Sequence, residues 1–137
     1  MFSILIADND ENDRLLAQLA LKECCLFNPV FFVADGVQAM DFLYKRGIYA
    51  DALSPGLVLL DLNMPRQDGR QVLAEMKANP VLKAIPVIIM TGSETEIDRE
   101  ASYRLGVMGY LIKPLTFTSL EAVIKTIPQL GFRIVEA

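Results

Sequence analysis

Four polar residues of complementary chemistry stand at the ends of short apolar runs. Asp8 and Asp61 supply carboxylates, Thr91 supplies a hydroxyl and Lys113 supplies an ammonium. Two carboxylates that lie close together repel each other, so they share a proton or bind a cation, and hard oxygen ligands favour Mg²⁺. An ammonium and a hydroxyl beside them would bind the oxygens of an incoming phosphoryl group.

Each of these residues also has a plainer explanation when it is taken alone. Asp8 or Asp61 could cap a following helix or turn, Thr91 could begin a helix, and Lys113 could be a solvated strand end. Only convergence of all four would make a site. The elements that position them therefore decide the question.

Five strand-length apolar runs recur along the chain. They are rich in β-branched residues or Leu and do not alternate with polar residues, which is typical of strands covered on both faces of a parallel sheet. The runs are Ile4–Ala7, Val30–Val33, Leu57–Leu60, Val87–Met90 and Tyr110–Ile112.

Helical periods separate and follow these runs, and the last one stops at Pro128. Their apolar positions are Leu15, Leu16, Leu19 and Ala20; Met40 and Leu43; Val72, Leu73 and Met76; Ile97, Ala101 and Leu105; and Leu120, Val123, Ile124 and Ile127. This strict alternation predicts one doubly wound α/β domain with a five-stranded parallel sheet and five helices. Because the carboxyl ends of parallel strands share one edge, the four polar residues are expected to meet there.

Three segments resemble the signature of response-regulator receivers of two-component signalling. They are 61–69 (DLNMPRQDG), 85–91 (IPVIIMT) and 109–114 (GYLIKP), and the likeness spans residues 3–128 in the expected order. The resemblance implies the flavodoxin-like strand order 2-1-3-4-5, a receiver domain over 1–128 and a C-terminal tail over 129–137.

Carried over to this sequence, the resemblance makes Asp61 the phosphoacceptor. Asp8 and the backbone carbonyl of Asn63 would join Asp61 around Mg²⁺, and Lys113 would pair with the phosphoryl oxygens. Thr91 would bond the phosphoryl group once it is attached.

Three further features follow from the same resemblance. Tyr110 would be the aromatic switch residue that changes rotamer with Thr91, Gly92 would leave the approach open, and the Lys113–Pro114 bond would be cis. Phosphorylation is then expected to be read on the surface of the fourth helix, fifth strand and fifth helix.

One position departs from the family pattern. The family has two consecutive acids after the first strand, whereas this chain has Ala7 followed by Asp8, and Asp10 is expected to cap the first helix. Weaker Mg²⁺ binding is expected. The departure also motivates an alternative function, a receiver fold that binds partners independently of phosphorylation.

The resemblance implies protein partners for this chain. With no His in the sequence, the phosphohistidine donor must be another protein, either a sensor histidine kinase or a phosphotransfer protein, and the output must be a downstream protein target. The long connection over 44–55 resembles receivers that work beside phytochrome-type kinases, although a tolerated surface loop explains it equally well. The segment 131–135 either docks or pairs with a second chain as a homodimer, or is a disordered tail.

Composition excludes several other functions. A net charge of −4 without a basic cluster argues against direct nucleic-acid binding, and no apolar run is long enough to span a bilayer. Adjacent Cys24 and Cys25 are expected to be unpaired thiols of a cytoplasmic protein. A flavin-binding reading fails because Asp8, Asp10 and Glu11 would repel a phosphate after the first strand. The chain is expected to be a substrate and partial catalyst of its own modification rather than an enzyme.

Overall fold

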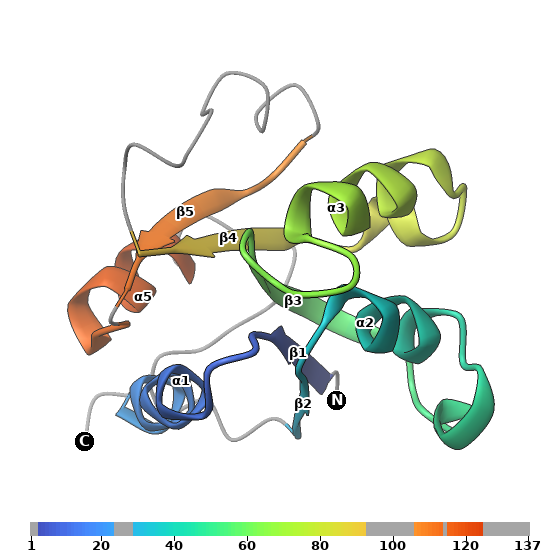
Figure 1. Ribbon diagram of the computed structural model, residues 1–137. Coiled ribbons are helices and arrows are strands. Elements are labelled where there is room, and N and C mark those ends of the chain that lie inside the picture. The colour runs from blue at the N-terminus through green and yellow to red at the C-terminus, as the bar shows by residue number, and fades with distance from the viewer. Residues whose placement is uncertain (1–2, 24–28, 93–105, 114, 125–137) are drawn as a thin grey trace.

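The computed structural model describes residues 3–23, 29–92, 106–113 and 115–124. A single parallel sheet forms the middle of the molecule (Figure 1). The strands are β1 (Ser3–Ala7), β2 (Val30–Val33), β3 (Pro55–Asp61), β4 (Val87–Thr91) and β5 (Gly109–Ile112). The helices are α1 (Glu11–Glu23), α2 (Gly36–Leu43), α3 (Gly69–Ala78) and α5 (Phe117–Ile124), with short 3-10 turns η1 (Gly47–Tyr49) and η2 (Leu82–Ala84).

The strand order is β2-β1-β3-β4-β5, which confirms the predicted doubly wound sheet. All four strand pairs are parallel, so the carboxyl ends of the strands lie on one edge. At that edge Asp61 is in register with Met90 of β4, and Thr91 is in register with Ile112 of β5. The sheet therefore brings the ends of β1, β3, β4 and β5 together.

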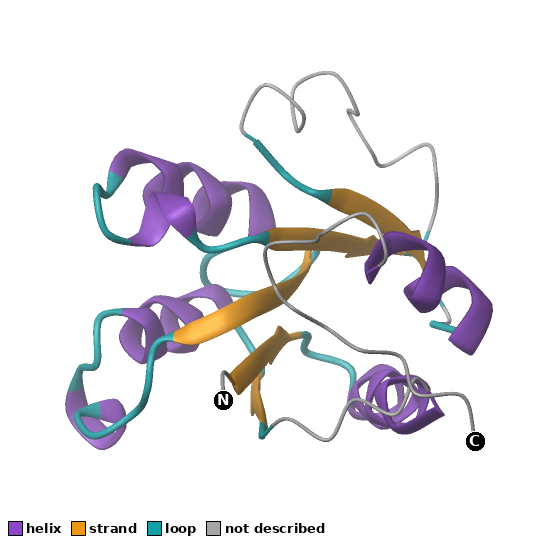
Figure 2. Cartoon of the chain, turned by 180° about the vertical axis from the view of Figure 1, so that it is seen from behind, coloured by secondary structure: helices purple, strands orange, loops and turns teal. Residues whose placement is uncertain are grey.

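Helices cover both faces of this sheet. Figures 1 and 2 show α1 and α5 together on one face and α2 and α3 on the other, and each pair is in contact. Successive strand residues belong to opposite cores: Ile4 and Ile6 pack on the α1 and α5 side, whereas Leu5 and Ala7 pack on the α2 and α3 side. This two-sided burial explains why the strands are apolar without alternation.

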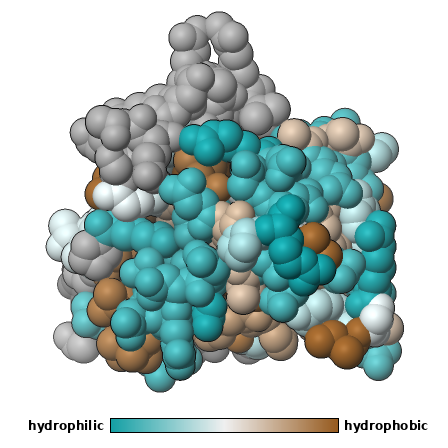
Figure 3. Space-filling model, viewed as in Figure 1, coloured by the Kyte–Doolittle hydropathy of each residue, from teal (hydrophilic) through white to brown (hydrophobic). Residues whose placement is uncertain are grey.

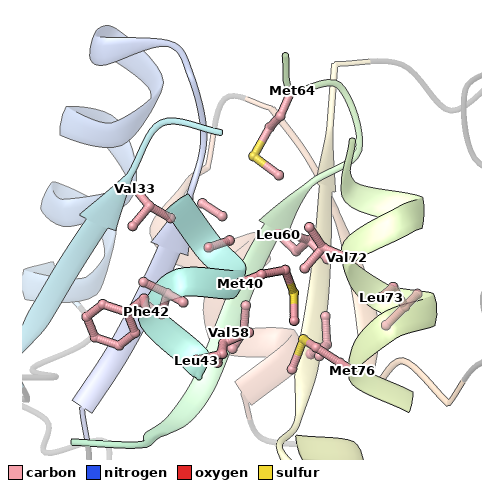
Figure 4. Close-up of a cluster of buried hydrophobic side chains, with 14 of the residues drawn as sticks. Val33, Met40, Phe42, Leu43, Val58, Leu60, Met64, Val72, Leu73 and Met76 are labelled. Atoms are coloured by element: carbon pink, nitrogen blue, oxygen red, sulfur yellow. The ribbon is translucent and has the colours of Figure 1, made fainter. Parts of the chain in front are cut away.

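The core between α2, α3 and the sheet combines aliphatic strand residues with flexible helix side chains. Figure 4 shows Met40 from α2 and Met76 from α3 pointing toward Val58 and Leu60 of β3. Unbranched Met side chains fill the irregular space between two helices. The end of β3 that carries Asp61 is therefore held by close packing.

Carboxylates begin three of the helices. The Asp35 side chain accepts a 2.8 Å hydrogen bond from the Gln38 N–H at the start of α2, and Asp10 accepts a 3.1 Å bond from the Asp13 N–H at the start of α1. Asp68 forms a reciprocal capping box with Gln71 at α3. The predicted capping role of Asp10 is confirmed.

The buried face of α1 differs from the leucine period in the sequence. Leu15, Leu16 and Leu19 are 54%, 39% and 46% exposed, whereas the residues buried against the sheet are Ala17, Ala20 and Leu21. Ala17, Ala20 and Leu21 share a core cluster with Ile4 and Ile6 of β1, and α1 also contacts α5. Of the apolar positions in this predicted helical period, Ala20 is buried, whereas Leu15, Leu16 and Leu19 are exposed.

Several predictions fall outside the described residues: the fourth helix, Cys24 and Cys25, Pro114 with its peptide bond, the end of the last helix and the tail. In the segments that the structure covers, no helix has the length and apolar character needed to cross a membrane.

Candidate functional site

The side chain of Lys113 lies at the centre of the carboxyl edge. Its Nζ is 2.8 Å from Oδ2 of Asp8, 2.9 Å from Oδ2 of Asp61 and 3.0 Å from Oδ2 of Asp13. An ammonium has three N–H donors, so three carboxylates account for all of them. The predicted convergence of Asp8, Asp61 and Lys113 is confirmed, and Asp13 is an additional member.

Asp8 is fixed through its backbone and its side chain. Its N–H donates to the Val33 carbonyl at 3.0 Å, which extends the pairing of β1 with β2 by one residue. Oδ1 accepts a 2.9 Å bond from the Asp10 N–H, and the Arg14 guanidinium donates a 2.7 Å bond to the Asp8 carbonyl. The second oxygen, Oδ2, is thereby directed toward Lys113.

Asp61 is the last residue of β3, and its side chain is 5% exposed. Oδ1 accepts a 3.0 Å hydrogen bond from the Asn63 N–H, and Oδ2 faces Lys113. Gly69 allows α3 to begin directly against this strand end, because a Cβ at position 69 would collide with the Asp61 carbonyl oxygen. Strand, loop and helix together hold the carboxylate in place.

Thr91 and Lys113 are joined through the backbone. Thr91 is the last residue of β4 and is fully buried, and its carbonyl accepts a 2.7 Å bond from the Lys113 N–H. Tyr110 of β5 is half-buried beside the core on the α2 and α3 side. Among the described residues, no atom lies within 4 Å of the place that a Cβ at Gly92 would take.

One positive charge faces three carboxylates at this edge. Burial alone would lower the pKa of Lys113, but hydrogen bonds to Asp8, Asp61 and Asp13 outweigh burial and raise that pKa above its ordinary value. Burial raises the pKa of Asp8, although hydrogen bonds from Lys113 and Asp10 act in the opposite direction. The lysine is therefore firmly cationic.

The oxygen donors of this cluster fit a hard divalent cation. Asp8 and Asp61 contribute two buried carboxylates, and the exposed Asn63 bonds Asp61 through its backbone N–H. Within the described ranges no three Asp, Glu, His or Cys side chains are arranged to hold a metal ion. A cation here would rely on two carboxylates, with water and a backbone carbonyl completing its shell, an arrangement that Mg²⁺ readily accepts.

The sequence interpretation missed Asp13 as a member of the cluster. Asp13 lies in the first turn of α1, where a carboxylate suits the helix dipole, and this explains the residue without any contact outside the helix. The available signal was its place three residues after the capping Asp10, in a helix that starts at the site edge. The Asp13 to Lys113 contact joins residues one hundred positions apart, which periodicity within one helix does not reveal.

The known proteins to which this chain is similar include several response regulators. Response regulator Rcp1 of Synechocystis sp. is 42% identical over 124 residues, which are 90% of this chain and 84% of the relative. Its Mn²⁺-bound crystal structure matches with a TM-score of 0.80 and 39% identity, covering 99% of this chain and 98% of that one.

Two other solved structures are similar over almost the whole chain. The bacteriophytochrome response regulator RtBRR matches with a TM-score of 0.87 and 34% identity, covering 100% of this chain and 82% of that one. The phosphorylated cyanobacterial phytochrome response regulator RcpA matches with a TM-score of 0.80 and 37% identity, covering 98% and 99%.

The response regulator receiver domain model matches residues 4–125, which include every strand end that contributes to the Lys113 cluster. This match and the identity to Rcp1 agree with the observed strand order. The chain belongs to the response regulator receiver domain family.

Proposed function

We propose that this chain is a phosphorylation-dependent switch in which Asp61 accepts a phosphoryl group from a phosphohistidine. The observation that carries the proposal is the position of the Lys113 ammonium, 2.9 Å from the Asp61 carboxylate and 2.8 Å from the Asp8 carboxylate. A cation fixed beside a buried carboxylate can neutralise the charge of an incoming phosphoryl group. Phosphorylation of a relative, RcpA, supports the same chemistry here.

The transfer requires only one bond to form and one to break. An Asp61 carboxylate oxygen attacks the phosphorus, the phosphorus to nitrogen bond of the donor breaks, and the bond electrons remain on the imidazole, which takes up a proton. Lys113 then pairs with a phosphoryl oxygen, and the Thr91 hydroxyl donates to another. Mg²⁺ held by Asp8, Asp61 and the Asn63 carbonyl would offset further phosphoryl charge.

Conformational output is proposed to begin at Thr91 and Tyr110. The two residues lie on neighbouring strands, with Ile89 in register with Tyr110, and Tyr110 is only half-buried. A hydroxyl drawn toward the phosphoryl group leaves space that the ring can enter, and this exchange biases a two-state surface. A downstream protein reads that surface.

The proposed donor docks on α1. This helix supplies Asp13 to the cluster, and its next turns expose Leu15, Leu16 and Leu19. Figure 3 shows hydrophobic side chains over the α1 region beside a mainly hydrophilic central face. An apolar surface on the helix that also supplies Asp13 suits the protein that must bring a phosphohistidine to Asp61.

We further assign the donor to the phytochrome-type histidine kinases. The similarity to RtBRR and RcpA supports this assignment. The connection after α2 is packed rather than extended, since the Tyr49 ring lies 5.2 Å from the Phe42 ring, and Phe42 lies 5.5 Å from Phe31. This packing makes the 44–55 connection a defined surface for such a kinase.

The receiver occupies 1–128 in this proposal, and 129–137 form a tail. Phosphoryl transfer modifies the chain itself, so we do not class the protein as an enzyme, and its partners are proteins rather than nucleic acid. A cytoplasmic location follows from the need for an ATP-dependent kinase as donor.

The alternative, a module that binds partners without phosphorylation, is favoured by Ala7, which is fully buried in the apolar core.

Intact-mass measurement after incubation with acetyl phosphate and Mg²⁺ separates these two functions. The wild type and the control Asp51→Asn, which changes an exposed aspartate, should each gain one phosphoryl group. Asp61→Asn should gain none. No gain in the wild type would favour the phosphate-independent module.

A further inference from the structure

Lys113 has a partner that the phosphoacceptor chemistry does not require. Asp8 and Asp61 stand at strand ends with side chains 1% and 5% exposed, whereas Asp13 comes from the first turn of α1 and is 28% exposed. Its Oδ2 is 3.0 Å from the Lys113 Nζ, a distance suited to a charge-assisted hydrogen bond. A third carboxylate thus reaches the cluster from a helix.

The Asp13 side chain does not cap α1. Asp10 caps α1 through its own carboxylate, which accepts the bond from the Asp13 N–H. A residue three positions after a cap often bonds back to the cap in a reciprocal box, as Gln71 does with Asp68 in α3. In α1 the corresponding Asp13 carboxylate bonds Lys113 instead.

We propose that Asp13 is a positioning residue that accepts one hydrogen bond of the Lys113 ammonium in the resting site and competes with the phosphoryl group for that ammonium. This inference rests on the proposed phosphorylation of Asp61. When the phosphoryl group arrives, one N–H of Lys113 must turn from a carboxylate to a phosphoryl oxygen. Asp13 opposes that change because it attracts the ammonium and repels the anionic group.

Through this competition Asp13 slows the phosphorylation of Asp61. Without the Asp13 charge, Asp8 and Asp61 still hold Lys113 at 2.8 and 2.9 Å, so the lysine remains in the site. The incoming anion then meets one less carboxylate. Phosphorylation of Asp13→Asn by acetyl phosphate should therefore be faster, on the order of fivefold at saturating Mg²⁺ and low ionic strength.

Two further variants separate this role from a general effect of charge. Glu11→Gln removes a negative charge from the same exposed turn of α1 and should react like the wild type. Asp13→Glu keeps the carboxylate and should return the rate toward the wild-type value. Thermal unfolding of each variant checks that α1 remains folded.

The ammonium resonance of Lys113 gives a readout that does not depend on phosphorylation. Three hydrogen bonds slow exchange of its protons, so nitrogen-edited NMR should detect the signal in the wild type and Glu11→Gln and show it shifted or lost in Asp13→Asn. Equal rates for Asp13→Asn and Glu11→Gln, in a wild type that is phosphorylated, would overturn the inference. An unphosphorylated wild type would instead refute the proposed function, while an unchanged Lys113 signal in Asp13→Asn would still refute the contact.

Discussion

Arg66, in the loop that follows Asp61, forms an ion pair with Asp35 at the start of α2, with 3.2 Å between Nη1 and Oδ2. Asp35 is almost fully buried and uses its other oxygen to cap α2. Arg66 adopts a positive φ of 68°, which an L residue tolerates only when its surroundings hold it there. The loop that follows Asp61 is therefore attached to α2.

Gly36 permits this attachment, because a Cβ at position 36 would collide with the Gln67 carbonyl. Gly36→Ala should lower the free energy of unfolding by about 3 kcal/mol, since backbone must move to admit the methyl group. Gly92→Ala is the matched control, because its Cβ would meet no atom of the described residues within 4 Å. Chemical denaturation of both variants measures the difference, and equal stabilities would show that the loop adapts freely.

Metal affinity should follow the number of carboxylates at the end of β1. We expect Asp8→Ala nearly to abolish Mg²⁺ binding, Ala7→Asp to tighten it about threefold, and Asp10→Ala to change it little because Asp10 caps α1. Isothermal calorimetry tests all three variants. Because Ala7 is fully buried in the core, the folding of Ala7→Asp must be checked first. A strong loss in Asp10→Ala would identify Asp10 as a metal-site acid.

A phosphoryl mimic should perturb one side of the sheet more than the other. Adding beryllofluoride should shift backbone NMR signals mainly between Thr91 and Ile127, because Thr91 and Tyr110 are the proposed first residues to move. The attachment of Arg66 to Asp35 provides the competing route toward α2. Shifts confined to residues 36–46 would mean that α2 carries the output instead.

The C-terminal tail is expected to favour self-association. Its segment 131–135 is apolar and β-prone, so it can pair with a second chain. Truncation after Pro128 should lower any dimer fraction measured by light scattering at matched concentrations. An unchanged fraction would leave the tail without this role.

Most of the sheet could be predicted from the sequence because strands that are buried on both faces are apolar throughout, without alternating polar residues. Leu57 and Leu60, for example, are fully buried in β3 on opposite faces. The site edge followed from the same logic, since polar residues directly after such runs must share one edge. Asp8, Asp61, Thr91 and Lys113 all lie where this reasoning placed them.

The two features that sequence reasoning missed both concern α1. Its buried face carries Ala17, Ala20 and Leu21, whereas Leu15 and Leu19 are exposed, and the helical period of apolar residues does not separate these two sets. The contact of Asp13 with Lys113 depends on the placement of α1, which pairs a helix turn with a strand end across the whole chain. The spacing of apolar residues within one helix predicts neither the buried face of α1 nor this contact.

The central claim is that Asp61 carries the phosphoryl group, and chemical location of the modified residue tests it most directly. Borohydride reduces an aspartyl phosphate to homoserine, which peptide mass spectrometry can place in the sequence. After treatment with acetyl phosphate and Mg²⁺ we predict homoserine at position 61 alone. The homoserine should be absent when acetyl phosphate is omitted, and it should be reduced when Lys113 is replaced. Homoserine at position 8 or 13, with Asp61 unmodified, would contradict the account.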